Sequence, residues 1–111
     1  MRYSRTSAFR RLFRKLPGAR QEAAERALLR LDEALRLGRP APGLGLKELR
    51  HSLWEIRAGL LDRIVFFRSS DLIEFVVIGT HDEIKRFLRR LCPSEALLQS
   101  LLPKPGTLPI R

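Results

Sequence analysis

Apolar residues change their spacing along this chain, from a helical period in the first third to a strand period after residue 46. A stripe with i, i+3, i+4, i+7 spacing predicts a helix over residues 6–16, which Pro17 and Gly18 end. A second stripe predicts a longer helix over residues 20–37. A short strand can precede both helices.

The glycine- and proline-rich run at 38–45 predicts a loop. After it, the pattern predicts three strands, over residues 53–58, 62–68 and 72–79. Each of their two connections contains only three residues. Such short connections favour antiparallel neighbours, because parallel strands need a long crossover.

A capping box follows the last predicted strand. Thr80 and Glu83 have the spacing at which each side chain can bond to the other residue's N–H, so a helix is predicted from Thr80 to about Leu91. Residues 94–102 can add one or two helical turns, and three prolines make the last nine residues a flexible tail. The predicted fold class is α+β, a small antiparallel sheet with two N-terminal helices packed on one face and a short C-terminal helix.

The length and charge narrow the class of protein. A chain of 111 residues with 44% hydrophobic content forms one core. Lys and Arg together number 22 against 12 acidic residues, and only four of the 22 are lysines. Arginine grips phosphate with a planar fork, so the composition favours a polyanionic or carboxylate-rich partner.

Cysteine and hydropathy indicate the compartment. A single cysteine, Cys92, excludes an intrachain disulfide, and with His51 and His81 it makes no zinc-finger set, so neither a metal nor another cofactor is expected. No apolar run approaches the roughly 20 residues that cross a bilayer, and a cytoplasmic protein without membrane contact is predicted. The Arg-rich, acid-free first 21 residues also suggest a transit peptide, but their apolar stripe is better used in a core.

Several segments together resemble one family of proteins. Leu46-Lys-Glu-Leu49, Leu53-Trp-Glu-Ile-Arg57, Asp62-Arg-Ile-Val-Phe-Phe67 and Gly79-Thr-His-Asp-Glu-Ile84 occur in this order. The set resembles the RelE/ParE superfamily, and in particular its HigB and YafQ branches, over residues 1–91. Residues 1–92 are therefore predicted to form the toxin-like domain, with 93–111 as a C-terminal extension.

This resemblance implies the toxin of a bacterial type II toxin–antitoxin module. The implied activity is ribosome-dependent cleavage of messenger RNA, and the implied partners are the ribosome, its message and a cognate antitoxin that wraps the toxin in a hetero-oligomer. A ParE-like branch of the family poisons DNA gyrase instead. A non-catalytic protein of the same fold and a non-toxic RNA-binding module are further alternatives.

The resemblance also assigns roles to single residues. Arg63 stands where most members have the arginine that binds the scissile phosphate, and Glu55 and Arg57 stand on the preceding strand at positions that the ribonuclease branch fills with charged residues. His81 falls where the family has His or Arg. The tyrosine that several members carry in the final helix is absent, with Phe87 near its place, which leaves that tyrosine's role unfilled.

These residue types suit cleavage of RNA without a metal. The adjacent 2′-OH is the nucleophile, so a base, an acid and a cation for the phosphate are required. Glu55 is the expected base, His81 the expected acid because imidazole exchanges protons near neutral pH, and Arg57 and Arg63 the expected phosphate clamp. The alternative is structural: a solvated cross-strand charge pair at 55 and 57, and a histidine that only occupies the first turn of a helix.

Further basic residues are candidates for a positive rim around this site. If the last helix packs beside the sheet, they can contact RNA; otherwise they form a solvated surface. The aromatic residues of the strands are expected in the core rather than as stacking platforms. The candidate RNA-binding residues are Lys47, Arg50, His51, Arg68, Lys85, Arg86, Arg89 and Arg90.

Overall fold

The computed structural model of this protein describes residues 1–39 and 41–90. The predicted helical turns at 94–102, the proline-rich tail and Cys92 lie outside these residues. The described residues therefore include nearly all of the predicted toxin-like domain, residues 1–92, and none of the predicted C-terminal extension.

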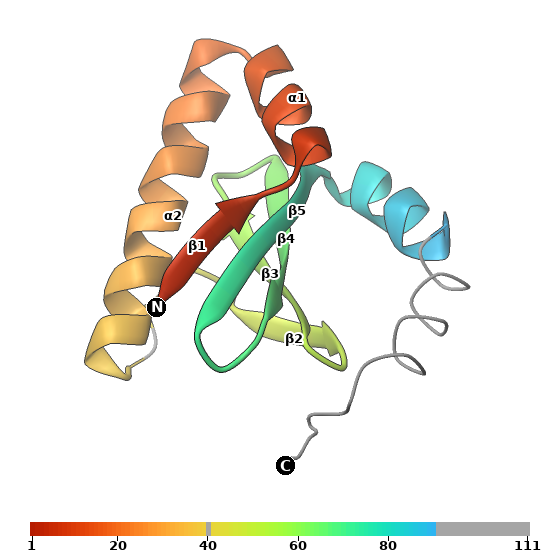
Figure 1. Cartoon of the computed structure of the whole chain (residues 1–111). Helices are drawn as coiled ribbons and strands as arrows, with labels where there is room; N and C mark the ends of the chain where they lie inside the picture. The colour runs from red at the N-terminus through yellow and green to blue at the C-terminus, as the bar shows by residue number, and fades with distance from the viewer. Residues whose placement is uncertain (40, 91–111) are drawn as a thin grey trace.

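The centre of the molecule is one sheet of five strands in the order β1-β5-β4-β3-β2 (Figure 1). Neighbouring strands run antiparallel except for β1, which lies parallel to β5 at one edge. The predicted α+β fold and the three predicted strands are confirmed, the last strand being one residue longer. The strands are β1 (Arg2–Arg5), β2 (Lys47–Arg50), β3 (Leu53–Ala58), β4 (Asp62–Arg68) and β5 (Leu72–Thr80).

Two features of this sheet were not predicted. β2 is only four residues long, too short for its alternation to stand out from the preceding loop. β1 was expected as a short strand, but its parallel pairing was not, because only the path of the two helices decides which edge it reaches. The first residue of β1 pairs with the first of β5, Arg2 with Leu72.

Two helices connect β1 to β2, and both lie on the same face of the sheet (Figure 1). α1 (Ser7–Lys15) begins after Thr6, whose hydroxyl oxygen accepts a hydrogen bond from the Phe9 N–H at 3.0 Å. α2 (Gly18–Leu37) ends at Gly38, whose left-handed backbone (φ 66°) is the conformation that glycine tolerates best. No helix among residues 1–39 and 41–90 is both long and apolar enough for a bilayer crossing.

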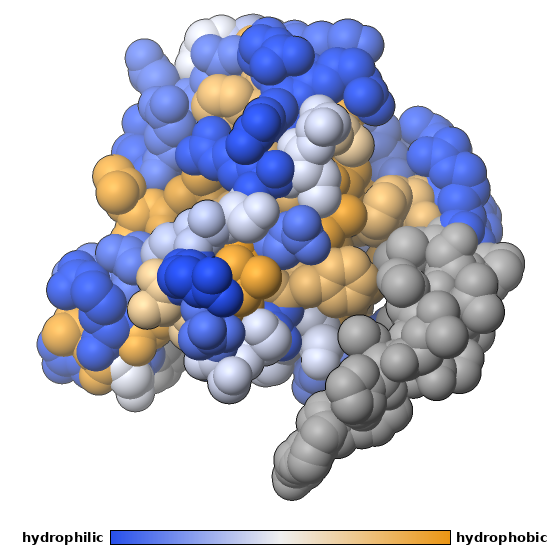
Figure 2. All heavy atoms as spheres, in the orientation of Figure 1, coloured by the Kyte–Doolittle hydropathy of each residue, from blue (hydrophilic) through white to orange (hydrophobic). Residues whose placement is uncertain are grey.

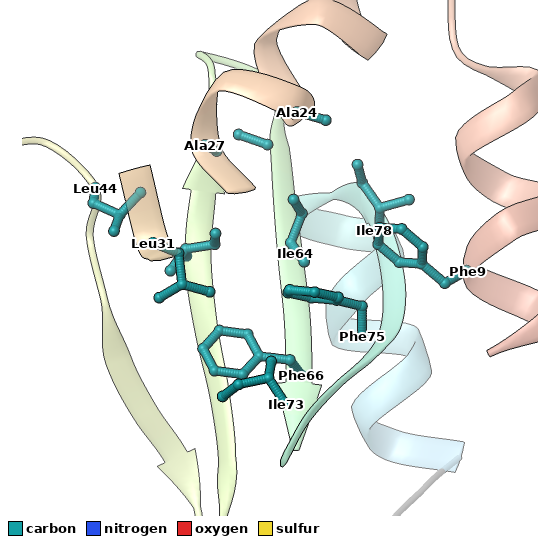
Figure 3. Close-up of a cluster of buried hydrophobic side chains, with 12 residues drawn as sticks. Phe9, Ala24, Ala27, Leu31, Leu44, Ile64, Phe66, Ile73, Phe75 and Ile78 are labelled. Carbon is teal, nitrogen blue, oxygen red and sulfur yellow. The ribbon is translucent and has the colours of Figure 1, made fainter. Parts of the chain in front are cut away.

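The main core lies between these helices and the sheet (Figure 3). Phe9 of α1 and Leu31 of α2 meet Phe66 and Phe75 of the central strands, and all four side chains are buried. Each buried side chain of this size contributes roughly 1.5–3 kcal/mol relative to exposure. The core therefore contains Phe66 and Phe75, as predicted, and Trp54 packs against it, whereas Phe67 packs in the cluster on the opposite face.

Within residues 1–39 and 41–90, the opposite face of the sheet is only partly covered. Residues 81–90 form a helix that packs Ile84 against Leu53, Val65 and Val77. The predicted capping box begins this helix: the Thr80 N–H donates to Glu83 Oε1 at 2.8 Å, and the Glu83 N–H donates to Thr80 Oγ1 at 3.3 Å. The helix covers the apolar part of this face and leaves its charged part beside it.

A buried ion pair joins α2 to the beginning of β4. Arg20 donates from Nε and Nη2 to the two carboxylate oxygens of Asp62, at 2.8 and 2.6 Å. Asp62 is fully buried, and its hydrogen bonds raise the pKa of Arg20 above the ordinary value for arginine. This pair fixes the first turns of α2 against the end of the sheet where β3 ends and β4 begins.

Candidate functional site

Alternation along β3 divides its residues between the two faces of the sheet. Trp54 and Ile56 contact the core under the helices, whereas Leu53 contributes to the cluster on the opposite face. Glu55 and Arg57 share the side of Leu53 because successive strand residues point to opposite faces. The predicted division between a core side and a charged side is confirmed.

Glu55 is the centre of a charged cluster on this second face. Its side chain is buried, with 7% of the residue exposed, and its strand neighbours are Lys47 on β2 and Val65 on β4. Its Oε2 lies 3.6 Å from Arg63 Nε and 3.9 Å from Lys47 Nζ. A carboxylate and two cations from three strands therefore meet at one point.

Arg63 is held in place by this cluster without being fully engaged. Its Nε is buried and, among the described residues, has no hydrogen-bond partner, although the ion pair with Glu55 is close. The side chain keeps 24% of its surface exposed, so a ligand can still reach it. The Arg63 guanidinium is held in position and still has N–H groups that can donate hydrogen bonds to an anion.

Arg57 lies directly opposite Arg63 in the register of β3 and β4. Like charges at such positions destabilise a sheet. Glu55 pairs with Arg63, but Arg57 forms no ion pair with any residue in the described part of the chain. Its aliphatic stem lies against Gly45, where an added Cβ would be 2.9 Å from Arg57 Cγ. The second arginine of the predicted clamp is thus near the cluster and lacks an anionic partner.

His81 stands at the end of β5 nearest this cluster. Gly79 is the strand partner of Arg63, and His81 follows two residues later as the first residue of the helix 81–90. The side chain is exposed and makes no hydrogen bond or ion pair within residues 1–39 and 41–90. The fold therefore brings His81 to the same end of the sheet as Arg57 and Arg63, but not into contact with Glu55.

The predicted RNA-binding residues occupy three different places. Lys47 belongs to the Glu55 cluster, with Arg50 at the end of the same strand and His51 exposed in the turn that follows. Arg68 lies elsewhere: its guanidinium is 5.4 Å from the ring centre of Trp54, on the helix-covered face. Arg68 is therefore separated from the other candidates by the sheet itself.

The remaining candidates line the outer side of the helix 81–90. Ile84, Phe87 and Leu88 pack toward the sheet, which leaves the basic residues of this helix exposed. Figure 2 shows the same division, with hydrophilic spheres on the outer side of the helix and hydrophobic ones toward the sheet. These outer residues are Lys85, Arg86, Arg89 and Arg90.

Phe87, which the resemblance puts near the place of the family's tyrosine, has a packed side chain. Phe87 is half-buried in the cluster around Val65 and Val77. It has no hydroxyl, so it cannot orient a nucleophile or donate a hydrogen bond.

The pairing of Lys47 with Glu55 was not predicted from the sequence, because β2 was not predicted. The only signal for β2 was the short alternation of residues 46–49.

Comparisons with solved structures identify the fold. The RelE–RelB toxin–antitoxin complex of Methanococcus jannaschii contains a chain that is 20% identical, with a TM-score of 0.57 over 76% of this chain and 96% of that one. The DinJ–YafQ complex of E. coli gives 15% identity and a TM-score of 0.57 over 75% and 97% of the two chains. A YoeB/ParE toxin from Agrobacterium tumefaciens gives 16% identity and a TM-score of 0.55 over 73% and 99%.

The protein therefore has the RelE/ParE fold, and the predicted resemblance is confirmed at the level of architecture. No family model matches the sequence, and no curated relative matches it either. At these identities the likeness defines the fold and leaves the activity to be argued from the residues themselves.

Proposed function

We propose that this protein is the toxin of a type II toxin–antitoxin pair and that it cleaves messenger RNA on the ribosome. The observation that carries the proposal is the cluster of Glu55, Arg63 and Lys47 on the sheet face away from α1 and α2. It brings a carboxylate and two cations close enough together to contact one phosphate group. The RelE/ParE fold supports the proposal, since the chains it resembles are toxins.

The proposed reaction uses the 2′-OH next to the scissile phosphate. Glu55 takes the proton from this hydroxyl, the oxygen attacks phosphorus, and the bond to the 5′-oxygen breaks. His81 gives a proton to the leaving 5′-oxygen when the ribosome-bound strand brings that oxygen to the end of β5. Arg63 and Arg57 stabilise the charge that develops on the phosphoryl oxygens.

The two cations beside Glu55 affect how this residue can act as the general base. Lys47 and Arg63 both lie close to the carboxylate oxygen Oε2 of Glu55, so an incoming phosphate competes with the carboxylate for the same guanidinium. Binding of RNA would draw Arg63 toward the phosphate and release Glu55 to act as base. This exchange explains how a buried ion pair can belong to a working site.

The test is cleavage of a defined message on purified ribosomes, mapped by primer extension. Arg63→Gln and Glu55→Gln should each lower the cleavage rate by about a hundredfold or more. Arg68→Gln is the matched control, because its guanidinium stacks on Trp54 on the other face of the sheet. Folded wild-type protein that leaves the message intact would overturn the proposal.

A second candidate function is inhibition of DNA gyrase without RNA cleavage. The half-buried Phe87 favours it, because no hydroxyl is available where several ribonuclease relatives have one. Expression of the chain in bacteria separates the two candidates. Accumulation of DNA breaks with intact messages supports gyrase inhibition, whereas loss of messages without DNA breaks supports the ribonuclease.

The proposed partners are a cognate antitoxin, the ribosome and its message, in the cytoplasm. Solved relatives are complexes of a toxin with its antitoxin, which supports the first of these. Co-expression with the product of the adjacent gene should restore growth that the toxin alone stops. A toxin that remains harmful with that product bound would remove the antitoxin from the proposal.

A further inference from the structure

A pocket of 480 Å³ lies between α2 and the end of β3. Its walls come from three segments: α2, the turn between β3 and β4, and the loop that follows α2. The lining residues are Ala23, Arg26, Ala27, Arg30, Gly43, Arg57, Gly59 and Leu60.

The charge of this pocket is entirely positive. Arg26, Arg30 and Arg57 line it, and no carboxylate of the described residues does. Arg30 donates a hydrogen bond to the carbonyl of Pro42, while Arg26 and Arg57 form no ion pair within the parts of the chain that the structure describes. Three arginine residues and no described acidic residue line the pocket, so its electrostatic potential is positive and favours an anion.

The pocket wall depends on a close approach of backbone to helix. Gly59 has a left-handed backbone (φ 83°), and a Cβ added to it would lie 3.0 Å from the Ala23 Cβ. The turn between β3 and β4 therefore packs tightly on α2 only because residue 59 has no side chain. This packing sets the position of Arg57 relative to Arg26 and Arg30.

Arg57 belongs both to this pocket and to the strand position opposite Arg63. We infer that the pocket binds a phosphate of RNA, with Arg26 and Arg30 as its ligands and Arg57 as the residue that it shares with the proposed cleavage site. The inference rests on the proposed function for the identity of the ligand. Guanidinium groups bind phosphate oxygens in pairs, and consecutive phosphates of one strand, or a phosphate of ribosomal RNA, can supply the anion.

The test compares two double variants of the full chain with equal loss of charge. Arg26→Gln with Arg30→Gln removes the pocket arginines that the cleavage chemistry does not use, and Arg10→Gln with Arg11→Gln removes two exposed arginines of α1. The probe is a fluorescently labelled single-stranded RNA oligonucleotide, titrated at several salt concentrations. The pocket variant should bind about tenfold or more weakly, with a salt slope lower by roughly 0.7 for each phosphate that it no longer neutralises.

Two kinds of ribosome distinguish the sources of the phosphate. A defect with the free oligonucleotide and with message-loaded ribosomes, but not with empty ribosomes, identifies the cleaved strand. A defect with both kinds of ribosome, but not with the free oligonucleotide, identifies ribosomal RNA. Equal binding by the two double variants to all three probes overturns the inference. A polyglutamate peptide that displaces the RNA equally well at equal charge also overturns it, because the pocket would then not select phosphate.

The binding assay is independent of cleavage, so the inference and the proposed function fail separately. Wild-type protein that binds RNA through the pocket but never cleaves it refutes only the ribonuclease. Circular dichroism and thermal unfolding check that the variants are folded. If removing the hydrogen bond from Arg30 to Pro42 unfolds the double variant, Arg26→Gln alone gives the answer, since Arg26 makes no described hydrogen bond or ion pair that folding requires.

Discussion

The two faces of the sheet are made from alternate residues of the same strands, yet they bury different kinds of side chain. Under α1 and α2, Ile56, Ile64 and Phe66 are fully buried among other apolar side chains. On the other face, Glu55 and Arg63 interrupt the apolar set, and the helix 81–90 covers only the part next to them. The first face buries mainly apolar side chains next to the helices, which stabilises the fold. The second face has charged side chains at positions that apolar residues could occupy.

This difference shows which polar residues serve the fold and which remain for a ligand. Asp62 is buried on the helix side, but Arg20 satisfies both of its carboxylate oxygens. Arg63 is half-buried on the opposite side with an Nε that has no hydrogen bond in the described chain. A closed ion pair stabilises a protein's architecture, whereas an incompletely bonded one is available for binding.

The largest expected effect follows from breaking the ion pair between Arg20 and Asp62. Arg20→Met leaves Asp62 buried without its partner, and the free energy of unfolding should fall by about 3–5 kcal/mol. Arg2→Met is the matched control, because the Arg2–Asp71 pair is exposed and contributes at most about 1 kcal/mol. Urea unfolding measures both. Similar losses in the two variants would contradict the assigned role of the buried pair.

A smaller effect is expected at the edge of the charged face. Gly45→Ala places a methyl group 2.9 Å from Arg57 Cγ and forces alanine into a left-handed backbone (φ 69°). The strain should cost about 1–2 kcal/mol and displace Arg57, so RNA affinity should fall as well. Gly38→Ala shares the strain but meets no atom within 4 Å. If both variants bind RNA as tightly as the wild type, Arg57 is not a ligand.

The smallest expected effect belongs to the parallel edge of the sheet. Burial, followed by the hydrogen bond to Asp32 at 2.6 Å, raises the pKa of Tyr3 to about 12 from its ordinary value of 10. Folding therefore favours the protonated phenol. This contribution is fully present below about pH 10 and is lost as the pH rises toward 12.

The measurement is simple because Tyr3 is the only tyrosine of the chain. Its near-ultraviolet absorbance should titrate near pH 12 in the folded protein, and Asp32→Asn should bring that midpoint down. Urea unfolding at about pH 9 and about pH 11 should show a steeper loss of stability in the wild type than in Tyr3→Phe. Equal losses would mean that the phenol does not contribute.

Much of the architecture followed from the spacing of apolar residues. The helices, three strands and the capping box at Thr80 were predicted because each depends on local periodicity or on residues three apart. The division of Glu55 from Trp54 between two faces was predicted for the same reason. The short strand β2 was not, since four residues carry too little pattern.

The sequence by itself determined most of the secondary structure, the sign of the charge and the residue types available for phosphate chemistry, because these depend on composition or on neighbours along the chain. Only the tertiary structure decided which charges meet. The register between strands brought Lys47 and Arg63 to Glu55 and put Arg57 opposite Arg63, and the packing of α2 formed the pocket that Arg57 also lines. Such contacts join residues far apart in the chain, and their geometry is set by the packing of the whole core.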